Sequence, residues 1–561
     1  SSDLPANSFA GIAAMIISFH LTGRYLEATA RGKASEAIRK LLNLGAKTAL
    51  IIVDGQETEI PIHKLKPDDV FIVKPGAKIP TDGIIVNGLS TIDESMATGE
   101  SMPVARKTGD QVLGATMNLD GYLEVKATQV GAQTFLAQVI KMVSEAQHSK
   151  VPIQLLADKI TAVFVPIVLL LAAAVFTAWI VFPVQMAAIA QGIAPWFAQK
   201  STLASALMAA IATLVIACPC ALGLATPTAL MVGSGIGANK GILIRNGEAL
   251  QRMRNMDVLV FDKTGTLTHG KPELVKIETL EGSESELLSL AAALESASEH
   301  PIAKAIINKA ANMNIPQRES FSTSPGKGIS GNIGGKEYQL GSADFVAEQG
   351  IKLSHMMDAE LAFTTPVLLA SEGKLLAVFY IADTLKDEAF RVVNDLKNRG
   401  IKTYLISGDN QSTADAIAKR CGIEHVLAKV LPADKAGKVS ELQKQGFVVG
   451  MVGDGINDAP ALKQADIGFA MGLGTDIAIE AADITLLRGD LKLIPTAINL
   501  SLETFRKIRQ NLFWAFFYNL IAIPLAALGI LHPVMAEIAM ASSSVTVVTN
   551  ANLLKVRFSK K

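Results

Sequence analysis

The sequence predicts a multi-domain α+β membrane protein in which a bundle of transmembrane helices alternates with soluble domains. Half of the 561 residues are hydrophobic and 19% are charged, and the mean hydropathy is +0.34. The apolar residues gather in long stretches, whereas the charged residues fill two blocks between them. A plain soluble enzyme would have a lower mean hydropathy and a pure membrane bundle would have fewer charges, so this chain combines both kinds of segment.

Five stretches are long and apolar enough to cross a bilayer, which takes about 20 mostly apolar residues. We expect spans at about 8–28, 159–182, 203–233, 511–531 and 534–554. The first is the least apolar, because it contains His20 and Arg24. The alternative is that these stretches are buried core helices of a soluble protein.

Basic residues follow the first and the last expected span. The positive-inside rule therefore places the regions after both spans in the cytoplasm, and with five spans both soluble blocks fall on that side. The basic residues are Arg24, Arg31, Lys33, Arg39 and Lys40 after the first span and Lys555, Arg557, Lys560 and Lys561 after the last.

Charge and cysteine content exclude two other classes of protein. Lysine plus arginine and aspartate plus glutamate both number 52, so the net charge is zero and a general nucleic-acid binder is excluded. Three cysteines, two of them in one apolar run, do not make a disulfide scaffold. The start of the chain has no Met and no basic region, and we expect it to be part of a longer protein with further helices upstream.

The first soluble block, about 31–155, contains short β-like runs broken by Gly and Pro turns. These runs are Thr48–Val53, Val70–Val73 and Gly83–Val86. The larger block, about 240–508, alternates apolar strands with amphipathic helical patterns, which is typical of an α/β domain.

Three strands of the larger block end in polar residues suited to phosphate chemistry. Val258–Phe261 leads into Asp262-Lys263-Thr264-Gly265-Thr266, and parallel strands deliver such groups to the ligand-binding edge of an open sheet. Asp262 is a candidate nucleophile that would form an acyl phosphate. The strand Val448–Val452 leads into Asp454 and Asp458, whose carboxylates suit Mg²⁺.

The third strand, Thr403–Ile406, ends in Ser407-Gly408-Asp409-Asn410. Lys435, which lies between the last two strands in the sequence, is placed to neutralise a transferred phosphoryl group. A single Asp at a strand end is usually a turn or cap residue. Three such ends with a lysine are better explained by a catalytic site.

The third expected span is interrupted by Cys218-Pro219-Cys220. Proline removes a backbone donor, and a broken span is tolerated where it lines a site. Two thiolates form a soft ligand pair, which favours Cu(I) or zinc over Na⁺, K⁺ or Ca²⁺. The alternative is two ordinary buried cysteines.

Together these motifs resemble the P-type ATPases. The resemblance rests on DKTGT at 262–266, GDGIND at 453–458 and Thr98-Gly99-Glu100-Ser101 in the first soluble block. It implies that Asp262 is phosphorylated, with Thr264, Lys435 and Asp409 in the same catalytic site. It further implies that Asp262, Thr264, Asp454 and Asp458 form the Mg²⁺ region, and that Glu100 positions the hydrolytic water.

The resemblance also implies a domain plan. A transmembrane helix at 8–30 is followed by a β-rich actuator domain at 31–155 and by two transmembrane helices with the CPC motif at 156–235. A Rossmann-like phosphorylation domain of the haloacid-dehalogenase type covers 240–274 and 383–508. An α+β nucleotide-binding domain covers 275–382, and two more transmembrane helices cover 509–556. In the nucleotide-binding domain, Glu299, His300, Gly326 and Gly328 are the expected nucleotide contacts.

CPC resembles the signature of the heavy-metal branch of this family. Tyr518-Asn519 and Met540-Ala541-Ser542-Ser543-Ser544 resemble those of its copper(I)-transporting group. The implied ion ligands are Cys218, Cys220, Tyr518, Asn519, Met540 and Ser544. Glu27 and Asp158 match acidic positions where the ion enters the membrane, and Gly11 stands where that group often has an acidic residue.

The resemblance thus implies ATP-driven export of copper(I), with silver(I) as a mimic and with ATP and Mg²⁺ as cofactors. It implies a multi-pass protein, in the plasma membrane of a prokaryote, that receives copper from a soluble chaperone or a small-molecule donor. A zinc or cadmium pump, a membrane-anchored phosphatase of the haloacid-dehalogenase type and a non-catalytic copper-binding scaffold are the alternatives.

Overall fold

The computed structural model describes residues 6–34, 45–53, 56–94, 103–138, 140–141, 152–197, 201–298, 300–324, 327–348, 364–454, 458–472, 481–487 and 489–559. The chain divides into two compact units. One comprises Ser1–Arg254 with Thr496–Lys561, and the other comprises Asn255–Pro495. Each unit is described separately below.

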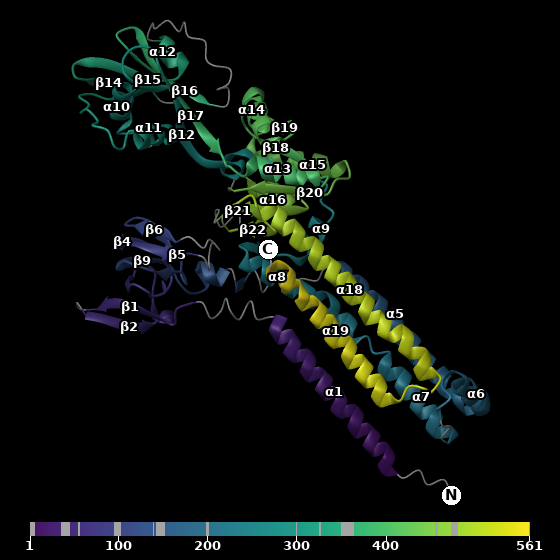
Figure 1. Cartoon of the computed structure of the whole chain (residues 1–561). Coiled ribbons are helices and arrows are strands. Elements are labelled where there is room, and N and C mark those ends of the chain that lie inside the picture. The colour runs from purple at the N-terminus through teal and green to yellow at the C-terminus, as the bar shows by residue number, and fades with distance from the viewer. Residues whose placement is uncertain are drawn as a thin grey trace. The chain divides into compact units, whose positions relative to one another are not determined.

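The first unit contains the long apolar helices, which pack along one another (Figure 1). α1 contacts α19, α5 contacts α7, and α19 contacts both α7 and α8. The helices are α1 (Ala6–Ala34), α5 (Pro152–Val181), α6 (Pro183–Ile193), α7 (Thr202–Ile216), α8 (Cys220–Asn239), α18 (Leu493–Ala527) and α19 (Pro533–Ser559). Small residues allow close approach, since a Cβ on Gly23 of α1 would lie 2.9 Å from Ala541 Cβ of α19.

Helices occupy all five stretches for which spans are predicted, but only three of these meet a stricter criterion of length and apolarity in the described part of the chain. These three are Pro152–Val181, Thr202–Asn239 and Leu493–Ala527. α1 carries His20, Arg24 and Glu27, and α19 carries Glu537 and a series of Ser, Thr and Asn residues. These polar groups lower the mean hydropathy of both helices, so the expectation of five spans is supported by composition for three of them.

The β-rich region of the first unit contains two sheets. The larger has the order β2-β1-β3-β9-β4-β7, and the smaller has the order β6-β5-β8. Its core includes Phe71, Ile79, Ile85, Leu123 and Val125, all at most 1% exposed. The strands are β1 (Thr48–Val53), β2 (Gln56–Pro61), β3 (Val70–Val73), β4 (Asp82–Asn87), β5 (Leu89–Asp93), β6 (Val104–Lys107), β7 (Gln111–Val112), β8 (Met117–Asn118) and β9 (Leu123–Gln129). The three runs predicted as strands are therefore confirmed.

In the second unit, strands run parallel in the order β22-β21-β20-β11-β18-β19. The strands are β11 (Val258–Asp262), β18 (Lys402–Ile406), β19 (His425–Leu427), β20 (Val449–Gly453), β21 (Ile467–Met471) and β22 (Ile484–Leu486). The helices between them are α13 (Ala389–Asn398), α14 (Gln411–Cys421), α15 (Lys435–Lys444) and α16 (Ala459–Gln464). β11 has β18 and β20 as neighbours, so the three predicted strand ends lie side by side at one edge.

A second sheet is inserted between β11 and α13. It is antiparallel, in the order β12-β17-β16-β15-β14-β13, with the long strands β12 (Thr268–Thr279) and β17 (Lys374–Leu385) leading into and out of it (Figure 1). The other strands are β13 (Ser322–Ser324), β14 (Gly328–Ile333), β15 (Lys336–Gly341) and β16 (Thr365–Ser371). The helices α10 (Glu284–Glu295), α11 (Pro301–Lys309) and α12 (Ala343–Glu348) pack on this sheet.

Candidate active site and membrane metal site

Asp262 is the last residue of β11, a strand whose five residues are all buried. The chain then turns sharply in the segment Lys263–Leu267, where Gly265 has a φ of +69°. A Cβ on Gly265 would lie 1.5 Å from Asp454 Oδ2, so only glycine lets this loop pass beside that carboxylate. The glycine of the DKTGT motif is therefore required by both backbone conformation and close packing.

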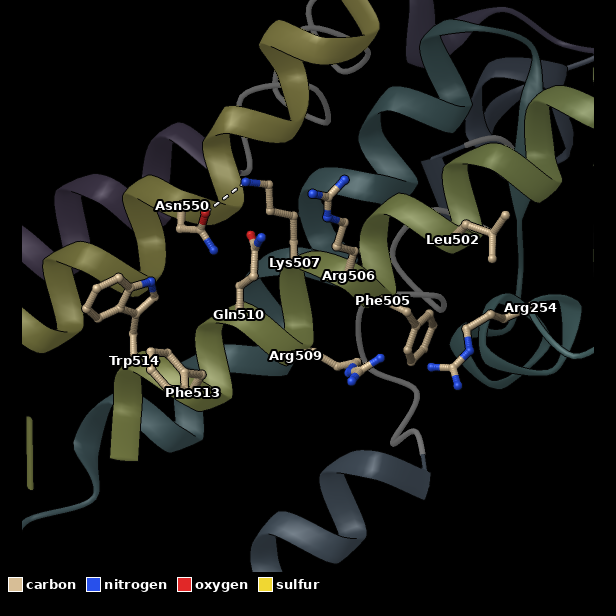
Figure 2. Close-up of a pocket in the computed structure, with 10 residues that line it drawn as sticks. All are labelled: Arg254, Leu502, Phe505, Arg506, Lys507, Arg509, Gln510, Phe513, Trp514 and Asn550. Carbon is tan, nitrogen blue, oxygen red and sulfur yellow. Dashed lines mark hydrogen bonds between the residues drawn. The ribbon is translucent and has the colours of Figure 1, made fainter. Parts of the chain in front are cut away.

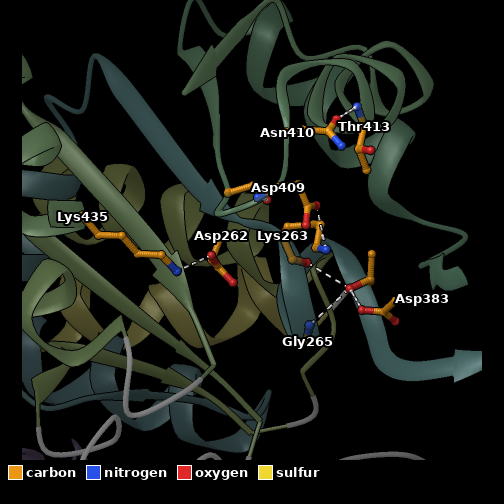
Figure 3. A network of polar contacts seen from close by, with 10 residues as sticks. Asp262, Lys263, Gly265, Asp383, Asp409, Asn410, Thr413 and Lys435 are labelled. Atoms are coloured by element: carbon orange, nitrogen blue, oxygen red, sulfur yellow. Dashed lines mark hydrogen bonds and ion pairs between the residues drawn. The ribbon is translucent and has the colours of Figure 1, made fainter. Parts of the chain in front are cut away.

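Lys435 joins two of the predicted carboxylates. Its Nζ lies 2.6 Å from Asp262 Oδ1 and 2.7 Å from Asp458 Oδ1, and all three side chains are less than 10% exposed. Figure 3 shows Lys435 reaching Asp262 from the opposite side to Lys263. The three residues are separated by up to 196 positions in the sequence and meet because β11 and β20 are adjacent.

The carboxylates in this cluster disfavour one another's ionisation. Burial, followed by the nearby Asp458, raises the pKa of Asp262 to about 6 despite the attraction of Lys435. Burial and Asp458 also raise the pKa of Asp454. Burial lowers the pKa of Lys435, but Asp262 and Asp458 outweigh burial, so the net shift is upward and the ammonium stays charged. Near neutral pH, Asp262 is mostly ionised and available as a nucleophile.

The cluster fits a magnesium ion. Single carboxylate oxygens of Asp262, Asp454 and Asp458 lie within 4.8 Å of one another. With all three ionised, Lys435 compensates one charge and two negative charges remain, which matches a divalent cation. Hard carboxylate oxygens are the ligands that Mg²⁺ prefers.

The second cation of the site is Lys263, whose Nζ lies 2.8 Å from Asp409 Oδ2. The next residue, Asn410, caps α14 by accepting a hydrogen bond from Thr413 N at 2.9 Å. Thr264 is exposed and lines a pocket of about 600 Å³ with Lys263 and Asp409. The pocket is also lined by Pro301 and Ile302 of α11 from the inserted domain. Its size suits a nucleoside triphosphate, and its wall carries the ammonium group of Lys263 together with the carboxylates of Asp383 and Asp409.

Asp383 and Lys386, at the end of β17, also support this loop, although the sequence analysis did not identify them. Thr268 Oγ1 donates to Asp383 Oδ2 at 2.5 Å and lies 3.0 Å from the carbonyl oxygen of Lys263. Lys386 Nζ donates to the carbonyl oxygens of Gly265 at 3.1 Å and Gly489 at 2.8 Å. One feature of the sequence could have identified both residues, namely polar residues at the end of a long apolar strand. The same feature identified Asp262.

The predicted nucleotide contacts have local structural roles where they are described. His300 is the N-cap of α11, and its Nδ1 accepts from Ile302 N at 3.3 Å. A Cβ on Gly328 would lie 2.5 Å from Phe345 Cδ1, so packing in the sheet alone requires this glycine. Glu299, Gly326 and Glu100, which is predicted to position water, lie outside the described residues, as does the side chain of Glu27. Asp158 is exposed on α5.

The CPC segment separates α7 from α8, as the proline predicts. α7 ends at Ile216 and α8 begins at Cys220 with Pro219 as its N-cap. Cys218 and Cys220 are joined as a disulfide in this structure, with their Cα atoms 5.5 Å apart. Cys220 Sγ also lies 3.9 Å from Met540 Sδ of α19. Three sulfur atoms from two helices therefore gather at the break.

The other predicted ion ligands lie on α18 and α19. Tyr518 Oη is 3.3 Å from Thr546 Oγ1, which joins these two helices. Asn519 is 8% exposed and Ser544 is 5% exposed. Ser543 Oγ, next to Ser544, is buried without a hydrogen-bond partner among the described residues. Buried polar groups of this kind inside a helix bundle are costly unless they serve a site.

Comparisons with known proteins agree with this geometry. Residues 43–144 match the P-type ATPase actuator domain, and residues 256–466 match the haloacid dehalogenase-like hydrolases. The chain is 49% identical over 555 residues to a probable copper-exporting P-type ATPase V of Mycobacterium tuberculosis (strain CDC 1551 / Oshkosh), covering 98% of this chain and 70% of that protein. It is 45% identical over 545 residues to a probable copper-importing P-type ATPase A of Enterococcus hirae, covering 96% and 72%.

Among solved structures, the chain is similar to a zinc-transporting PIB-type ATPase in the E2·Pi state. The TM-score is 0.63 at 33% identity, over 97% of this chain and 87% of that one. The haloacid-dehalogenase match includes Asp262, the predicted nucleophile, and the actuator match covers the strands β1–β9. The fold, the phosphorylation site and the similarity over nearly the whole chain lead to one conclusion: the chain belongs to the P-type ATPase family, in its heavy-metal-transporting branch.

Proposed function

We propose that the chain is an ATP-driven pump that exports copper(I) and is phosphorylated on Asp262 in each cycle. We choose copper(I) because three sulfur atoms lie together at a break in a membrane helix. They belong to Cys218, Cys220 and Met540. Copper(I) favours few and soft ligands, which the two cysteines supply as thiolates once a cellular thiol has reduced their disulfide. Thioether sulfur also suits copper(I) better than it suits zinc.

The phosphorylation step uses groups already in place. The Asp262 carboxylate attacks the γ-phosphorus of ATP, the bond from that phosphorus to the β–γ bridging oxygen breaks, and ADP leaves. Lys435 holds Asp262 Oδ1 at 2.6 Å, which orients the carboxylate and screens the charge of the incoming phosphoryl group. A magnesium ion bound by Asp262, Asp454 and Asp458, with Thr264 beside it, would supply further charge neutralisation of the phosphate oxygens.

The second half-reaction needs a water molecule and a base. By resemblance, Glu100 positions water for attack on the aspartyl phosphate, and inorganic phosphate leaves as Asp262 is regenerated. Glu100→Gln should therefore still be phosphorylated but lose its phosphate slowly, so that phosphoenzyme accumulates. Decay at the wild-type rate in this variant would remove Glu100 from the mechanism.

Phosphorylation by labelled ATP tests the enzyme activity. Acid-stable phosphoenzyme should form in the wild type and be absent in Asp262→Asn. Asp257→Asn is the matched control, because Asp257 immediately precedes β11 and is exposed at the strand's other end. Label that remains on Asp262→Asn would show that another residue is the phosphate acceptor.

A zinc or cadmium pump is the second candidate, since the solved relative is described as zinc-transporting. Phosphoenzyme formation with Cu(I), Ag(I), Zn(II) and Cd(II) separates the two. Copper(I) and its mimic silver(I) should stimulate phosphorylation, whereas Zn(II) should not. A membrane-anchored phosphatase would instead turn over simple phosphate esters without metal, and Cys218→Ser would not change that turnover.

The direction of transport is part of the proposal, since one relative is named an exporter and another an importer. The basic residues after the first and last helices favour cytoplasmic soluble domains. Inside-out vesicles with ATP outside should then accumulate copper(I). The copper donor, either a soluble chaperone or a small-molecule complex, would deliver the ion on the same side, near Glu27 and Asp158.

A further inference from the structure

A basic pocket of about 740 Å³ lies beside α18, and its lining residues include none of the predicted ion ligands. Among the residues that the structure describes, four cations line it, namely Arg254, Arg506, Lys507 and Arg509, and no carboxylate does. Figure 2 shows that these groups come from two parts of the chain, because Arg254 follows α9 (Gly247–Met253) and the other three belong to α18. A pocket of this composition attracts an anion.

The cations are only partly compensated. Glu503 forms an ion pair with Arg557 at 2.9 Å and lies 3.9 Å from Arg506, and Lys507 Nζ donates to Asn550 Oδ1 at 2.8 Å. Arg254 and Arg509 form no ion pair or hydrogen bond within the part of the chain that the structure describes. Two guanidinium groups, each able to donate several hydrogen bonds to phosphate oxygens, therefore remain available to a ligand.

The pocket continues into an apolar surface. Phe513 and Trp514 line its far end on α18 (Figure 2). Further along the helix, Phe517 is 37% exposed and Leu520 is 75% exposed, and Phe513 itself is 58% exposed. Residues 513, 517 and 520 share one face of the helix because they follow the three-and-four spacing. Basic residues followed by aromatic and then aliphatic residues match the depth profile of a membrane interface.

We propose that this pocket binds the headgroup of an anionic phospholipid, with the acyl chains lying along Phe513, Phe517 and Leu520. The phosphate is held by Arg254, Arg506 and Arg509, and Trp514 lies at the level of the glycerol backbone. α18 is one of the helices apolar enough to span the membrane, so a lipid is the anion that meets both halves of this surface. A free phosphate would satisfy the cations and leave the aromatic and aliphatic face without a ligand.

The lipid would sit on the helix that carries two proposed ion ligands. Arg509 and Asn519 are ten residues apart on α18, which is about 15 Å along a helix. Binding or release of a lipid at this pocket would therefore act on α18, and a change in the position of α18 would move the proposed ligands Tyr518 and Asn519.

Tryptophan fluorescence tests the proposal. The chain has three Trp residues, of which Trp179 is fully buried and Trp196 is 80% exposed. In a Trp196→Phe background, the signal lost on the further change Trp514→Phe reports on the pocket. The full chain is placed in nanodiscs with dibrominated phosphatidylglycerol or dibrominated phosphatidylcholine at equal mole fraction, because bromine quenches only an indole that it contacts.

We expect phosphatidylglycerol to quench Trp514 more strongly than phosphatidylcholine does. Arg254→Gln/Arg509→Gln should abolish the difference, because each cation near an anionic membrane contributes about fivefold in binding. Arg254→Lys/Arg509→Lys keeps the charge and should retain most of the difference, which shows that the site still folds. Lys159→Gln is the matched control, since Lys159 is exposed on another membrane helix outside the pocket.

Equal quenching by both lipids, or preferential quenching that survives Arg254→Gln/Arg509→Gln, would overturn the proposal. Inorganic phosphate, compared with chloride at the same ionic strength, separates the two sources of the anion. If phosphate alone removes the difference between the lipids, the pocket is a site for a soluble phosphate and the lipid assignment is wrong. The fluorescence measurement requires neither copper nor ATP, so its result tests the lipid proposal independently of the transport proposal.

Discussion

Cys220 Sγ on α8 lies 3.9 Å from Met540 Sδ on α19, although 320 residues separate them in the sequence. The contact places a thioether from the last helix at the break made by Pro219. The contact brings together the CPC motif and the motif that begins at Met540, which lie far apart in the sequence. The first prediction concerns this contact.

Cys218→Ser or Cys220→Ser should eliminate copper-stimulated ATPase activity, because each change places a hard hydroxyl where a soft donor was. Met540→Leu keeps the volume but removes one sulfur, and should raise the copper(I) concentration for half-maximal stimulation by about tenfold. Met535→Leu on the same helix is the control, since Met535 is 53% exposed.

Phosphorylation from inorganic phosphate runs the cycle backwards without bound copper and should persist in all of these variants. If either cysteine variant lost it, the cysteines would be structural. If both cysteine variants kept copper stimulation, the ion site would lie elsewhere.

Lys435→Met should destabilise the phosphorylation domain by about 3 kcal/mol near pH 7, because it leaves Asp262 and Asp458 buried without their cation. The loss should shrink as the pH falls toward about 6, because removing Lys435 raises the pKa of Asp262 above its wild-type value of about 6 and the folded variant therefore takes up this proton at a higher pH. Hydrogen exchange of β11 and β20 measures the effect.

The control for this prediction is Lys438→Met, one turn further along α15. Its side chain is 38% exposed and lies 3.0 Å from Glu441, so its effect should stay within about 0.5 kcal/mol. Equal protection of β11 in Lys435→Met and the wild type would mean that the buried ion pairs contribute nothing to stability.

Gly265→Ala should disable phosphorylation without unfolding the domain. The new Cβ would lie 1.5 Å from Asp454 Oδ2 at a φ of +69°, so either the loop or the carboxylate must move. We expect the rate of phosphoenzyme formation to fall at least about tenfold and the Mg²⁺ requirement to rise. Gly437→Ala in α15 has nothing within 4 Å of the added methyl group and should behave as wild type.

The thiol of Cys421 should be inert in the folded protein. Burial raises its pKa to about 11, and it is 1% exposed. At pH 8 about one molecule in a thousand would carry the reactive thiolate. In a Cys218→Ser/Cys220→Ser background, iodoacetamide should label Cys421 slowly until urea unfolds the chain, and the native rate should increase about tenfold per pH unit below the pKa. Rapid native labelling at pH 8 would contradict the assigned burial.

The sequence was most informative wherever local pattern controls structure. The strand β11 and the polar run that begins at Asp262 could be read from a short apolar run with charged residues at its end, and Pro219 predicted the break between α7 and α8. The number of membrane spans was harder to predict from the sequence. α1 and α19 carry polar groups that face neighbouring helices, and their composition alone does not distinguish them from soluble helices.

The tertiary structure decided which of these groups meet. Lys435 could be assigned a role from the sequence, but its bonds to both Asp262 and Asp458 exist only because β20 is paired with β11. Asp383 and Lys386 lie at the end of an apolar strand that a local pattern indicates, but the loop that they support lies more than a hundred residues away, and only the pairing of β17 with β12 brings them to it. Residue spacing reports on one strand or helix at a time, whereas a site depends on sheet order and helix packing, which long-range burial of apolar surface determines.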